Sequence, residues 1–479
     1  FSNRLFCNIA IIFFRVFYKN HYTNNKADKA MTEDNHRISQ NSKAWRQPRT
    51  TPTLQENYQT ITIVPSWPWW RKLLAFAGPG YLVAVGYMDP GNWATDLAAG
   101  SKFNYTLLSI VMLSNLMAIL LQHLAGKLGI VTGRDLAQAC RDHFSPTVTM
   151  ILWILCEIAI CACDLAEVIG SAIALKLLFN IPLIWGVCIT AFDVLVLLYF
   201  QKFNFRYIEV IVVLLMSIIA GCFWFEIAIS HPDFGAIMTG LMPNTDILFN
   251  PEMLYIAIGI IGATVMPHNL YLHSSIVQTR KYADTISGKK EAIKYTTIDT
   301  TIALSLAFFV NAAILIVAAA VFYAHGYQDV NDIEEAYKLL TPLVNAPLAS
   351  TLFALALLAS GQNSTLTGTL AGQIVMEGFL NIRLAPWLRR LLTRSVAIVP
   401  AIICIWLYGD SSIGSLMLFS QVILSFQLAF AVIPLIMFTS DRRKMGVLTN
   451  AAWVAILAWA SAFLIIGLNI KFLFDFFVN

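Results

Sequence analysis

The sequence predicts an all-α integral membrane protein with about eleven transmembrane helices. Three observations predict this class: few charged residues, a series of apolar segments long enough to cross a bilayer, and basic residues in alternate loops. Charged residues make up 13% of the 479 residues and hydrophobic residues 58%. About 25% of the residues in a typical soluble domain are charged. The composition therefore places the chain among membrane proteins.

The apolar segments have the length of membrane spans. A bilayer core of about 30 Å needs about 20 apolar residues per helix. The segments are continuous and show no alternation of polar and apolar residues, which favours helices over a β-barrel. They lie at about 73–98, 105–128, 148–178, 183–200, 207–229, 252–278, 297–325, 344–380, 392–408, 414–438 and 451–476.

Lys and Arg residues are concentrated in alternate loops. Loop 230–251 contains neither residue, and loop 326–342 contains only Lys338. The other loops are basic, at 71–72, 127–141, 202–206, 280–294, 383–394 and 442–444. The positive-inside rule then predicts a cytoplasmic N-terminus. With eleven helices, the C-terminus is expected outside the cytoplasm, and the protein is expected in the cell membrane.

Residues 1–70 differ in composition from the transmembrane domain expected at 71–479. The first Met is Met31, which makes it a candidate start, with residues 1–30 upstream of it. Residues 31–66 are polar and rich in Thr, Asn and Gln. Such a segment buries little apolar surface, so residues 1–70 are expected to form a disordered cytoplasmic tail.

Two of the apolar segments are interrupted by helix-breaking residues. The first segment contains VAVGYMDPGNWATD at 83–96, and the sixth contains GATVMPHNLYLH at 262–273. Five helices separate one interruption from the next, and an odd repeat length inverts the second unit in the membrane. Helices 1–5 and 6–10 are therefore expected to form an inverted repeat, with helix eleven added. Broken helices in corresponding positions indicate a transporter with its site at the midplane.

The first interruption combines backbone breakers with a charge. Pro90 cannot donate an amide hydrogen bond, so carbonyl groups are released at membrane depth. Asp89 adds a negative charge and Asn92 a neutral oxygen, and an intramembrane carboxylate is a functional hypothesis by default. The alternative for Asp89 is a structural cap of a half-helix. Asp96, further along, is either an interfacial residue or part of the site.

The second interruption adds a sulfur. Pro267 is expected to leave the carbonyl of Ala263 without a helical donor, beside the thioether of Met266. Oxygen ligands alone suit Mg²⁺ and Ca²⁺, whereas a soft sulfur ligand favours Mn²⁺, Fe²⁺ and Cd²⁺. The alternative for Met266 is ordinary core packing. If the two interruptions face each other, they hold a transition-metal ion.

Ionisable residues near the two interruptions suggest a proton path. His268 and His273 follow the second break, and histidine titrates nearest neutral pH. Glu157, Asp164 and Glu167 are spaced by seven and three, which places them on one face of a helix. The alternatives are packed histidines, and acids that form salt bridges to Arg394 or Lys176.

Other polar residues of the apolar segments have simpler readings. Gln421 and Gln427 lie in the tenth segment. Both can form hydrogen bonds between helices, and the alternative for Gln421 is metal ligation. The eight cysteines contain no CxxC pair and are expected to be small buried residues, neither a disulfide framework nor a zinc site.

Four motifs resemble the Nramp divalent-metal transporters, most closely the bacterial manganese branch. They are DPGN at 89–92, ATVMPHNLYLHSS at 263–275, GQNSTLTGTLAGQIVMEGF at 361–379 and SQVILSFQ at 420–427. The resemblance runs from about Arg71 to the end, with the motifs in order and in the right helices. Ala429 departs from the pattern, because family members often have Pro there.

The resemblance implies a LeuT-type fold and proton-coupled import of Mn²⁺ or Fe²⁺ by alternating access. It implies metal ligation by Asp89, Asn92, Met266 and the Ala263 carbonyl, with Gln421 joining in some states. The Gly86 carbonyl is a further ligand, and the missing side chain there is expected to matter little. The implied proton path comprises His268, Asp164, Glu167 and Arg394, with Glu157 as an additional candidate.

Other functions remain as alternatives. A transporter of a small organic solute such as an amino acid can share the fold, which by itself does not decide function. No HExxH or GxSxG motif is present, so no enzyme is expected. The expected partners are a divalent transition-metal ion, protons and the lipid bilayer. No cofactor, no nucleic acid and no obligatory protein partner are expected.

Overall fold

The computed structural model describes residues 44–190, 205–328, 330 and 332–478, except for 383, 384, 386, 387, 389–391, 393, 394, 397, 404, 405 and 407–412. Arg394, the expected partner of the acids, lies outside the described residues, as do residues 191–200 of the predicted helix 183–200 and part of the predicted helix 392–408. The described chain is almost wholly helical, as predicted, with one two-stranded parallel sheet.

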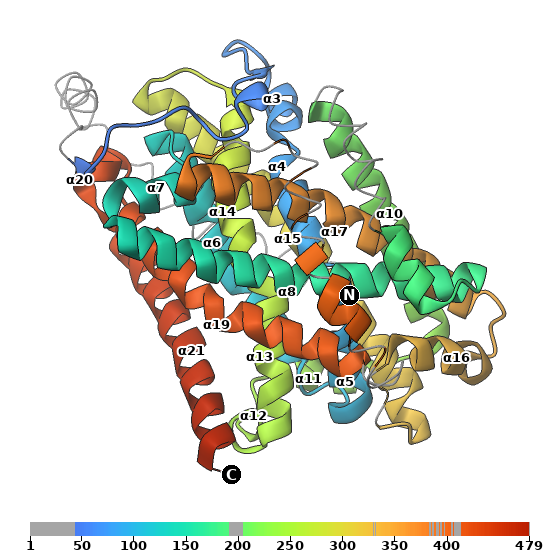
Figure 1. The fold of residues 1–479 in the computed structure, drawn as a ribbon. Coiled ribbons are helices and arrows are strands. Elements are labelled where there is room, and N and C mark those ends of the chain that lie inside the picture. The colour runs from blue at the N-terminus through green and yellow to red at the C-terminus, as the bar shows by residue number, and fades with distance from the viewer. Residues whose placement is uncertain are drawn as a thin grey trace.

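The helices follow the predicted segments closely (Figure 1). The long helices are α6 (Leu108–Thr132), α8 (Pro146–Phe179), α10 (Phe205–Ser230), α15 (Ile286–Val321), α17 (Ala349–Leu380), α19 (Ile413–Ser440) and α21 (Ala452–Val478). The broken helices are α4 (Pro79–Gly86) with α5 (Pro90–Phe103), and α13 (Pro251–Val265) with α14 (Pro267–Ile276). The shorter elements are η2 (Gln55–Asn57), β1 (Ile61–Thr62), α3 (Trp69–Phe76), α7 (Leu136–His143), α11 (Phe234–Gly240), α12 (Asp246–Phe249), η3 (Val277–Thr279), β2 (Arg280–Lys281), η4 (Tyr323–His325), α16 (Ile333–Val344), α20 (Arg442–Met445) and η6 (Gly446–Leu448).

Length and hydropathy mark seven membrane spans among the described residues: six of the long helices and the joined α13–α14 segment. Neither half of the first broken helix is long enough by itself to span the membrane, since α4 has 8 residues and α5 has 14. Helix α17 contains many small and polar residues, so its mean hydropathy is too low for it to be marked as a span. The total of eleven helices stays a prediction, because two predicted spans lie partly outside the described residues.

The two broken helices run in opposite directions. In Figure 1, α4 and α14 lie toward the end of the molecule that carries α3 and α7. Their continuations α5 and α13 lie toward the opposite end, beside α11 and α12. Each helix is interrupted near its middle, so the two breaks meet inside the bundle. This is the arrangement of an inverted repeat.

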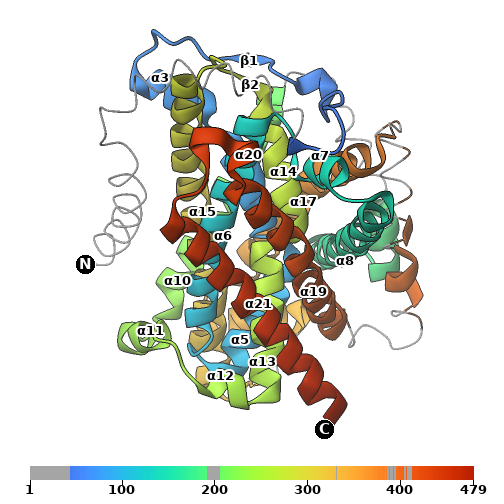
Figure 2. The same ribbon diagram turned by 90° about the vertical axis from the view of Figure 1, so that its left-hand side faces the viewer.

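The basic and non-basic loops lie at opposite ends of the molecule. The upper end in Figure 2 carries α7, α20 and β2, with basic residues in each. The lower end carries α11 and α12, from the loop without Lys or Arg, and the C-terminus. The alternation of charge along the sequence therefore corresponds to two faces of the fold.

The segment before the first helix differs from the expected disordered tail. Residues 44–63, named here the N-terminal strap, lie across the upper end from beside α20 to the sheet (Figures 1 and 2). Its strand β1 pairs in parallel with β2, Ile61 opposite Arg280. Trp45, Leu54 and Ile63 are buried. Composition missed this because only a few apolar residues, widely spaced, anchor the segment.

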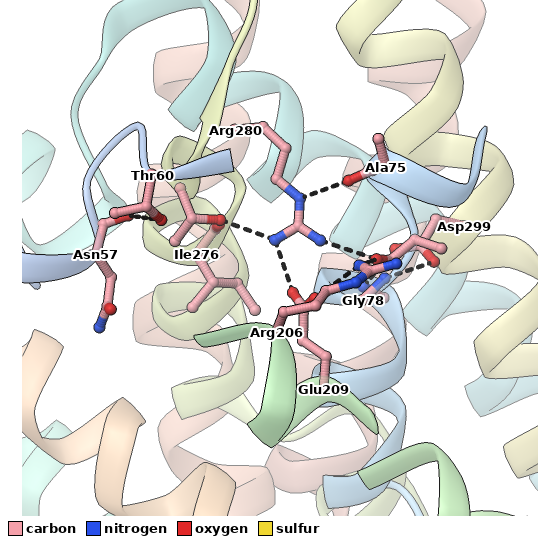
Figure 3. Close-up of polar contacts among 12 residues, drawn as sticks. Asn57, Thr60, Ala75, Gly78, Arg206, Glu209, Ile276, Arg280 and Asp299 are labelled. Atoms are coloured by element: carbon pink, nitrogen blue, oxygen red, sulfur yellow. Dashed lines mark hydrogen bonds and ion pairs between the residues drawn. The ribbon is translucent and has the colours of Figure 1, made fainter. Parts of the chain in front are cut away.

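A buried ion pair holds the turn between α3 and α4 (Figure 3). The Arg280 guanidinium lies 2.7 Å from a carboxylate oxygen of Glu209 on α10. It also donates to the carbonyl oxygens of Ala75 and Ala77, at 3.2 and 2.8 Å. Arg206 lies 2.8 Å from the other carboxylate oxygen of Glu209. One carboxylate thus positions two guanidinium groups over the start of the first broken helix.

Asp299 of α15 fixes the same turn from the other side. Its carboxylate accepts hydrogen bonds from the backbone N–H groups of Gly78 and Gly80, at 3.2 and 2.6 Å. The first N–H groups of α4 have no helical partner, so this carboxylate satisfies them. The N-terminal half of the first broken helix is thereby tied to α10, α15 and β2.

We expect Glu209→Gln to lower the melting temperature of the detergent-solubilised protein by several degrees. The side chains of Arg280 and Glu209 are only 1% and 3% exposed, and breaking a buried ion pair costs about 3–5 kcal/mol. Lys471→Gln is the control, since it breaks the Lys471–Asp475 pair, in which Lys471 is 37% exposed, and surface pairs contribute about 0–1 kcal/mol. Equal melting temperatures for the two variants would contradict the assignment.

Candidate metal site

The first break places a carboxylate inside the bundle. Helix α4 ends at Gly86, and α5 begins at Pro90 with Asp89 as its N-cap. The Asp89 side chain accepts a hydrogen bond from the backbone N–H of Asn92, at 2.9 Å. Asp89 is fully buried. The structure therefore shows the capping role that was the alternative reading, and it leaves the second carboxylate oxygen turned toward α8.

The second break places a strained residue beside the first. Helix α13 ends at Val265, and α14 begins at Pro267. Met266 between them has φ 30° and ψ 107°, in a region that residues with a side chain rarely adopt. Pro267 is four residues after Ala263 and has no N–H to donate, so the Ala263 carbonyl is released from the helix, as predicted.

Three predicted ligand oxygens converge on one point. The side-chain nitrogen of Asn92 lies 2.6 Å from Asp89 Oδ1, 3.0 Å from the Ala263 carbonyl oxygen and 3.4 Å from the Gly86 carbonyl oxygen. An amide N–H₂ group carries partial positive charge and takes only acceptors as partners. Its place among three oxygens, one of them a carboxylate, is also suited to a cation.

The opposite face of the Asn92 amide is held by two donors. Asn311 of α15 donates to Asn92 Oδ1 at 3.1 Å and to the Tyr87 carbonyl at 2.8 Å. Thr264 donates to the same Asn92 oxygen at 3.4 Å. Asn311 was not singled out in the sequence, because a lone Asn in a long apolar segment is most often a bond between helices.

The sulfur of Met266 lies inside the bundle near the carboxylate. Met266 is fully buried and packs with Cys163 of α8 and Leu424 of α19. Asn269 donates to its sulfur at 3.5 Å. The Cys163 sulfur lies 4.0 Å from Asp89 Oδ2 and 3.9 Å from a carboxylate oxygen of Glu167.

Cys163 was expected to be an ordinary buried cysteine and instead bridges two site candidates. Its spacing of four before Glu167 was the only signal in the sequence. Within the described part of the chain, no group of three His, Cys, Asp or Glu side chains could hold a metal ion. An ion held here would depend on the single carboxylate of Asp89 together with backbone, amide and thioether groups.

Gln421 of α19 lies against both broken helices. A Cβ at Gly91 would lie 2.2 Å from the Gln421 side-chain nitrogen, and a Cβ at Gly262 would lie 2.1 Å from its backbone oxygen. Glycine at both positions is therefore what lets α19 approach. Gln421 Oε1 is buried and has no hydrogen-bond partner among the described residues, so one acceptor beside the first break is left for a ligand.

Gly86 is constrained, contrary to the expectation that its missing side chain matters little. A Cβ there would lie 2.3 Å from the side-chain nitrogen of Asn269. Asn269 is the same residue that donates to the Met266 sulfur. A side chain at Gly86 would displace this amide and disturb the second break.

The two histidines have different surroundings. His273 Nδ1 lies 3.1 Å from Gln122 Oε1, and His273 Nε2 lies 3.4 Å from the Thr300 hydroxyl. The Gln122 amide nitrogen in turn donates to the Tyr87 hydroxyl at 2.9 Å. His268 interacts electrostatically with Asp164 of α8, and its Nδ1 has no hydrogen-bond partner among the described residues. Both histidines lie on α14. His268 interacts with the acidic helix α8, whereas His273 joins a separate chain of polar contacts through Gln122 and Tyr87.

The three acids of α8 are not equally buried. Asp164 and Glu167 are each 1% exposed, and the Thr365 hydroxyl of α17 donates to Glu167 at 3.4 Å. Glu157 is half-buried and accepts a hydrogen bond from Trp153 at 3.1 Å. The two inner acids lie near the breaks, and Glu157 lies toward the periphery.

Two further residues left open by the sequence are now placed. Lys176, an alternative partner for the acids, forms an ion pair of 2.6 Å with Glu334. Asp96 is 1% exposed, so its side chain lies inside the protein. Its Oδ2 has no hydrogen-bond partner among the described residues, and it interacts electrostatically with Asp89.

Comparison with known proteins identifies close relatives. The chain is 64% identical to the divalent metal cation transporter MntH of Nostoc sp. over 422 residues, which cover 88% of this chain and 96% of that protein. It is 62% identical to the transporter of the same name from Listeria monocytogenes over 431 residues, covering 90% and 96%.

Solved structures show the same fold. The manganese transporter of Eremococcus coleocola, in complex with an aromatic bis-isothiourea substituted compound, has a TM-score of 0.81 and 43% identity. The match covers 88% of this chain and 90% of that one. Mhp1 in an inward-facing conformation has a TM-score of 0.55 at 14% identity, covering 89% and 92%, and shares the fold alone.

The model of the family described as natural resistance-associated macrophage protein-like, Nramp, matches residues 80–475. This range contains both breaks and every helix that surrounds them. The fold is the LeuT-type inverted repeat that the motifs implied. The chain belongs to the Nramp family.

Proposed function

We propose that the chain imports divalent transition-metal ions, Mn²⁺ or Fe²⁺, across the cell membrane by alternating access. The observation that carries this proposal is the convergence of Asp89 Oδ1 and the carbonyl oxygens of Ala263 and Gly86 on one buried point. The metal relatives, at 62–64% identity over nearly their whole length, support the same cargo.

The site favours a cation over an organic solute with a carboxylate. Amino-acid sites of this fold use the free N–H groups of a broken helix to bind a carboxylate. Here the Asp89 carboxylate itself caps α5, at the place where such a solute would bind. A second negative charge beside it would be repelled. A divalent cation is attracted instead. It takes the place of the Asn92 N–H₂ group among the three oxygens.

Met266 gives the site its preference among divalent ions. Its strained backbone and full burial fix the thioether against Cys163 of α8, whose sulfur lies 4.0 Å from Asp89 Oδ2. Mg²⁺ and Ca²⁺ prefer oxygen ligands only, while transition metals accept sulfur. Rotation of the Asn92 amide turns its oxygen to the ion, and Gln421 Oε1 supplies a further oxygen. The set is open and weak enough to release its cargo.

Protons are proposed to travel beside the metal along α8. Asp164 and Glu167 are buried acids on one helix, Asp164 interacts with His268, and Cys163 lies between Glu167 and Asp89. A divalent ion bound at Asp89 repels a proton on this path, which couples the two movements. Arg394 and Glu157 are proposed as outer members of the path, and His273 as a member through Gln122.

The orientation follows from the charges of the loops. The end with α7, α20 and β2 faces the cytoplasm, because its loops are basic. The C-terminus then lies outside. Metal enters from the side of α11 and α12, and it leaves past α4 and α14.

We expect wild-type protein in liposomes to take up Mn²⁺ faster when the outside is acidic, and to discriminate against Ca²⁺ and Mg²⁺. In Met266→Ala the discrimination should fall about tenfold, equivalent to about 1.4 kcal/mol, because only oxygen ligands remain. Met117→Ala, a buried methionine on α6 away from the site, is the control and should discriminate like wild type. Absence of divalent-metal uptake in wild type would refute the cargo, and unchanged selectivity in Met266→Ala would refute the sulfur ligand.

His268→Gln should separate proton flow from metal flow. We expect Mn²⁺ uptake to continue while the number of protons entering per metal ion falls at least threefold, since the polar side chain remains but its titratable ring is lost. A pH-sensitive dye inside the liposomes measures proton entry, and radioactive ⁵⁴Mn measures the metal. The control is His325→Gln, an exposed histidine at the end of η4 whose ring nitrogen bonds the Val321 carbonyl. If both variants keep the wild-type ratio, His268 is not part of the path.

A further inference from the structure

The N-terminal strap is anchored near its start by Trp45, whose ring stacks on two cations. The Trp45 ring lies 4.6 Å from the Arg134 guanidinium and 4.9 Å from the Lys444 ammonium. It also packs against Phe438 of α19, with ring centroids 5.6 Å apart. The next residue donates its backbone N–H to the Asp142 carbonyl of α7, at 2.8 Å. The strap therefore begins in a buried socket made by α7, α19 and α20.

The middle of the strap joins three helices at two adjacent residues. The Thr53 hydroxyl donates to Asp135 at the start of α7, at 2.8 Å, and lies 2.7 Å from the Ser275 hydroxyl of α14. The backbone N–H of Leu54 donates to Glu377 near the end of α17, at 3.2 Å. Leu54 is buried with φ 48°, a strained conformation that persists only where contacts impose it.

The end of the strap is joined to the turn before α4 through one residue. Ile61 pairs with Arg280 in the sheet, and Ile63 is buried against Phe76 of α3. The side chain of Arg280 holds the carbonyls of Ala75 and Ala77 (Figure 3). The backbone of Arg280 thus binds the strap while its guanidinium binds the start of the first broken helix.

These anchors lie on helices that have different main packing partners. Helix α17 packs most extensively on α8, whereas α15 packs on α4, α5 and α6. Ser275 lies on α14 and Arg280 follows it, and α14 packs on α6 and α4 as well as on α17, the helix that carries Glu377. Alternating access rocks one group of helices against the other about the central site. The strap crosses the boundary between them at Thr53 and Leu54.

We propose that the N-terminal strap is a latch that holds the cytoplasmic end of the transporter closed. This inference rests on the proposed function for its direction of transport. To release the ion, α4 and α14 separate from α8 and α17, and the contacts of Thr53 with Ser275 and of Leu54 with Glu377 break. The strap slows opening toward the cytoplasm until the ion is bound.

Two cysteines of the chain report on this opening. Cys163 lies on α8 beside Asp89 and is 3% exposed, so it becomes reachable only when the path to the site opens. Cys140 lies on α7, near Asp135 under the strap, and is fully buried. A strap that only comes loose exposes Cys140, whereas an opened path exposes Cys163.

The experiment labels inside-out membrane vesicles with a membrane-impermeant maleimide without added metal, and measures each cysteine by peptide mass spectrometry. We expect Thr53→Val, which removes both hydroxyl contacts, to label Cys163 about tenfold faster than wild type. Trp45→Leu releases the other end of the strap and should act in the same direction. Thr60→Val is the matched control, because Thr60 is an exposed residue of the same strap and its hydroxyl donates to the Asn57 carbonyl within the strap, at 3.0 Å. It should label like wild type.

Unchanged labelling of Cys163 in both Thr53→Val and Trp45→Leu would overturn the proposal, as would faster labelling of Cys140 alone. The labelling needs no cargo. If wild type carries no Mn²⁺ but labelling responds as expected, the latch stands and the cargo assignment falls. If uptake is normal and Cys163 does not respond, the latch falls and the metal site stands.

Discussion

The structure depends on one constraint: backbone polar groups inside a bilayer must find partners within the protein. Two prolines, Pro90 and Pro267, break helices at membrane depth and release carbonyl oxygens there. Side chains from other elements then satisfy them. Asn311 bonds the Tyr87 carbonyl, and the Asn92 amide bonds those of Gly86 and Ala263. Because the partner is a neutral amide, a cation can replace it. The carbonyl oxygens released by the two helix breaks can then serve as ligands of that cation.

The same constraint explains how much could be predicted. The apolar segments, the position of the breaks and the alternation of basic loops follow from hydropathy and charge, which are properties of short stretches of sequence. The prolines made it possible to single out four residues of the site, each within four positions of Pro90 or Pro267: Asp89, Asn92, Ala263 and Met266. Their convergence on one point could only be seen in the fold.

What the sequence could not predict depends on contacts between distant segments. Cys163 looked like any small buried residue until α8 was placed beside Asp89. Gly86 looked free until Asn269 of the second break was found against it. The N-terminal strap looked disordered because its composition is polar, but Trp45 and Thr53 bind residues about 80 to 400 positions away. Neither periodicity nor composition contains that information.

Arg280 connects the site to the end of the molecule that carries the basic loops. It follows α14, it pairs with the strap, and with Glu209 it holds the turn that begins the first broken helix. In this account, movement of either broken helix alters the contacts between Arg280 and the strap, and release of the strap removes a restraint on both broken helices. In this account the ion site and the cytoplasmic closure are parts of one connected set of contacts.

The most direct test of the central claim is anomalous X-ray scattering from crystals soaked in Mn²⁺, with data collected on both sides of the manganese absorption edge. The account predicts one anomalous peak within bonding distance of Asp89 Oδ1, the Ala263 carbonyl oxygen and the Met266 sulfur, and its loss in Asp89→Asn crystals. A peak elsewhere, for example between Asp164 and Glu167, or no peak in a crystal of the wild-type protein at saturating Mn²⁺, would contradict it.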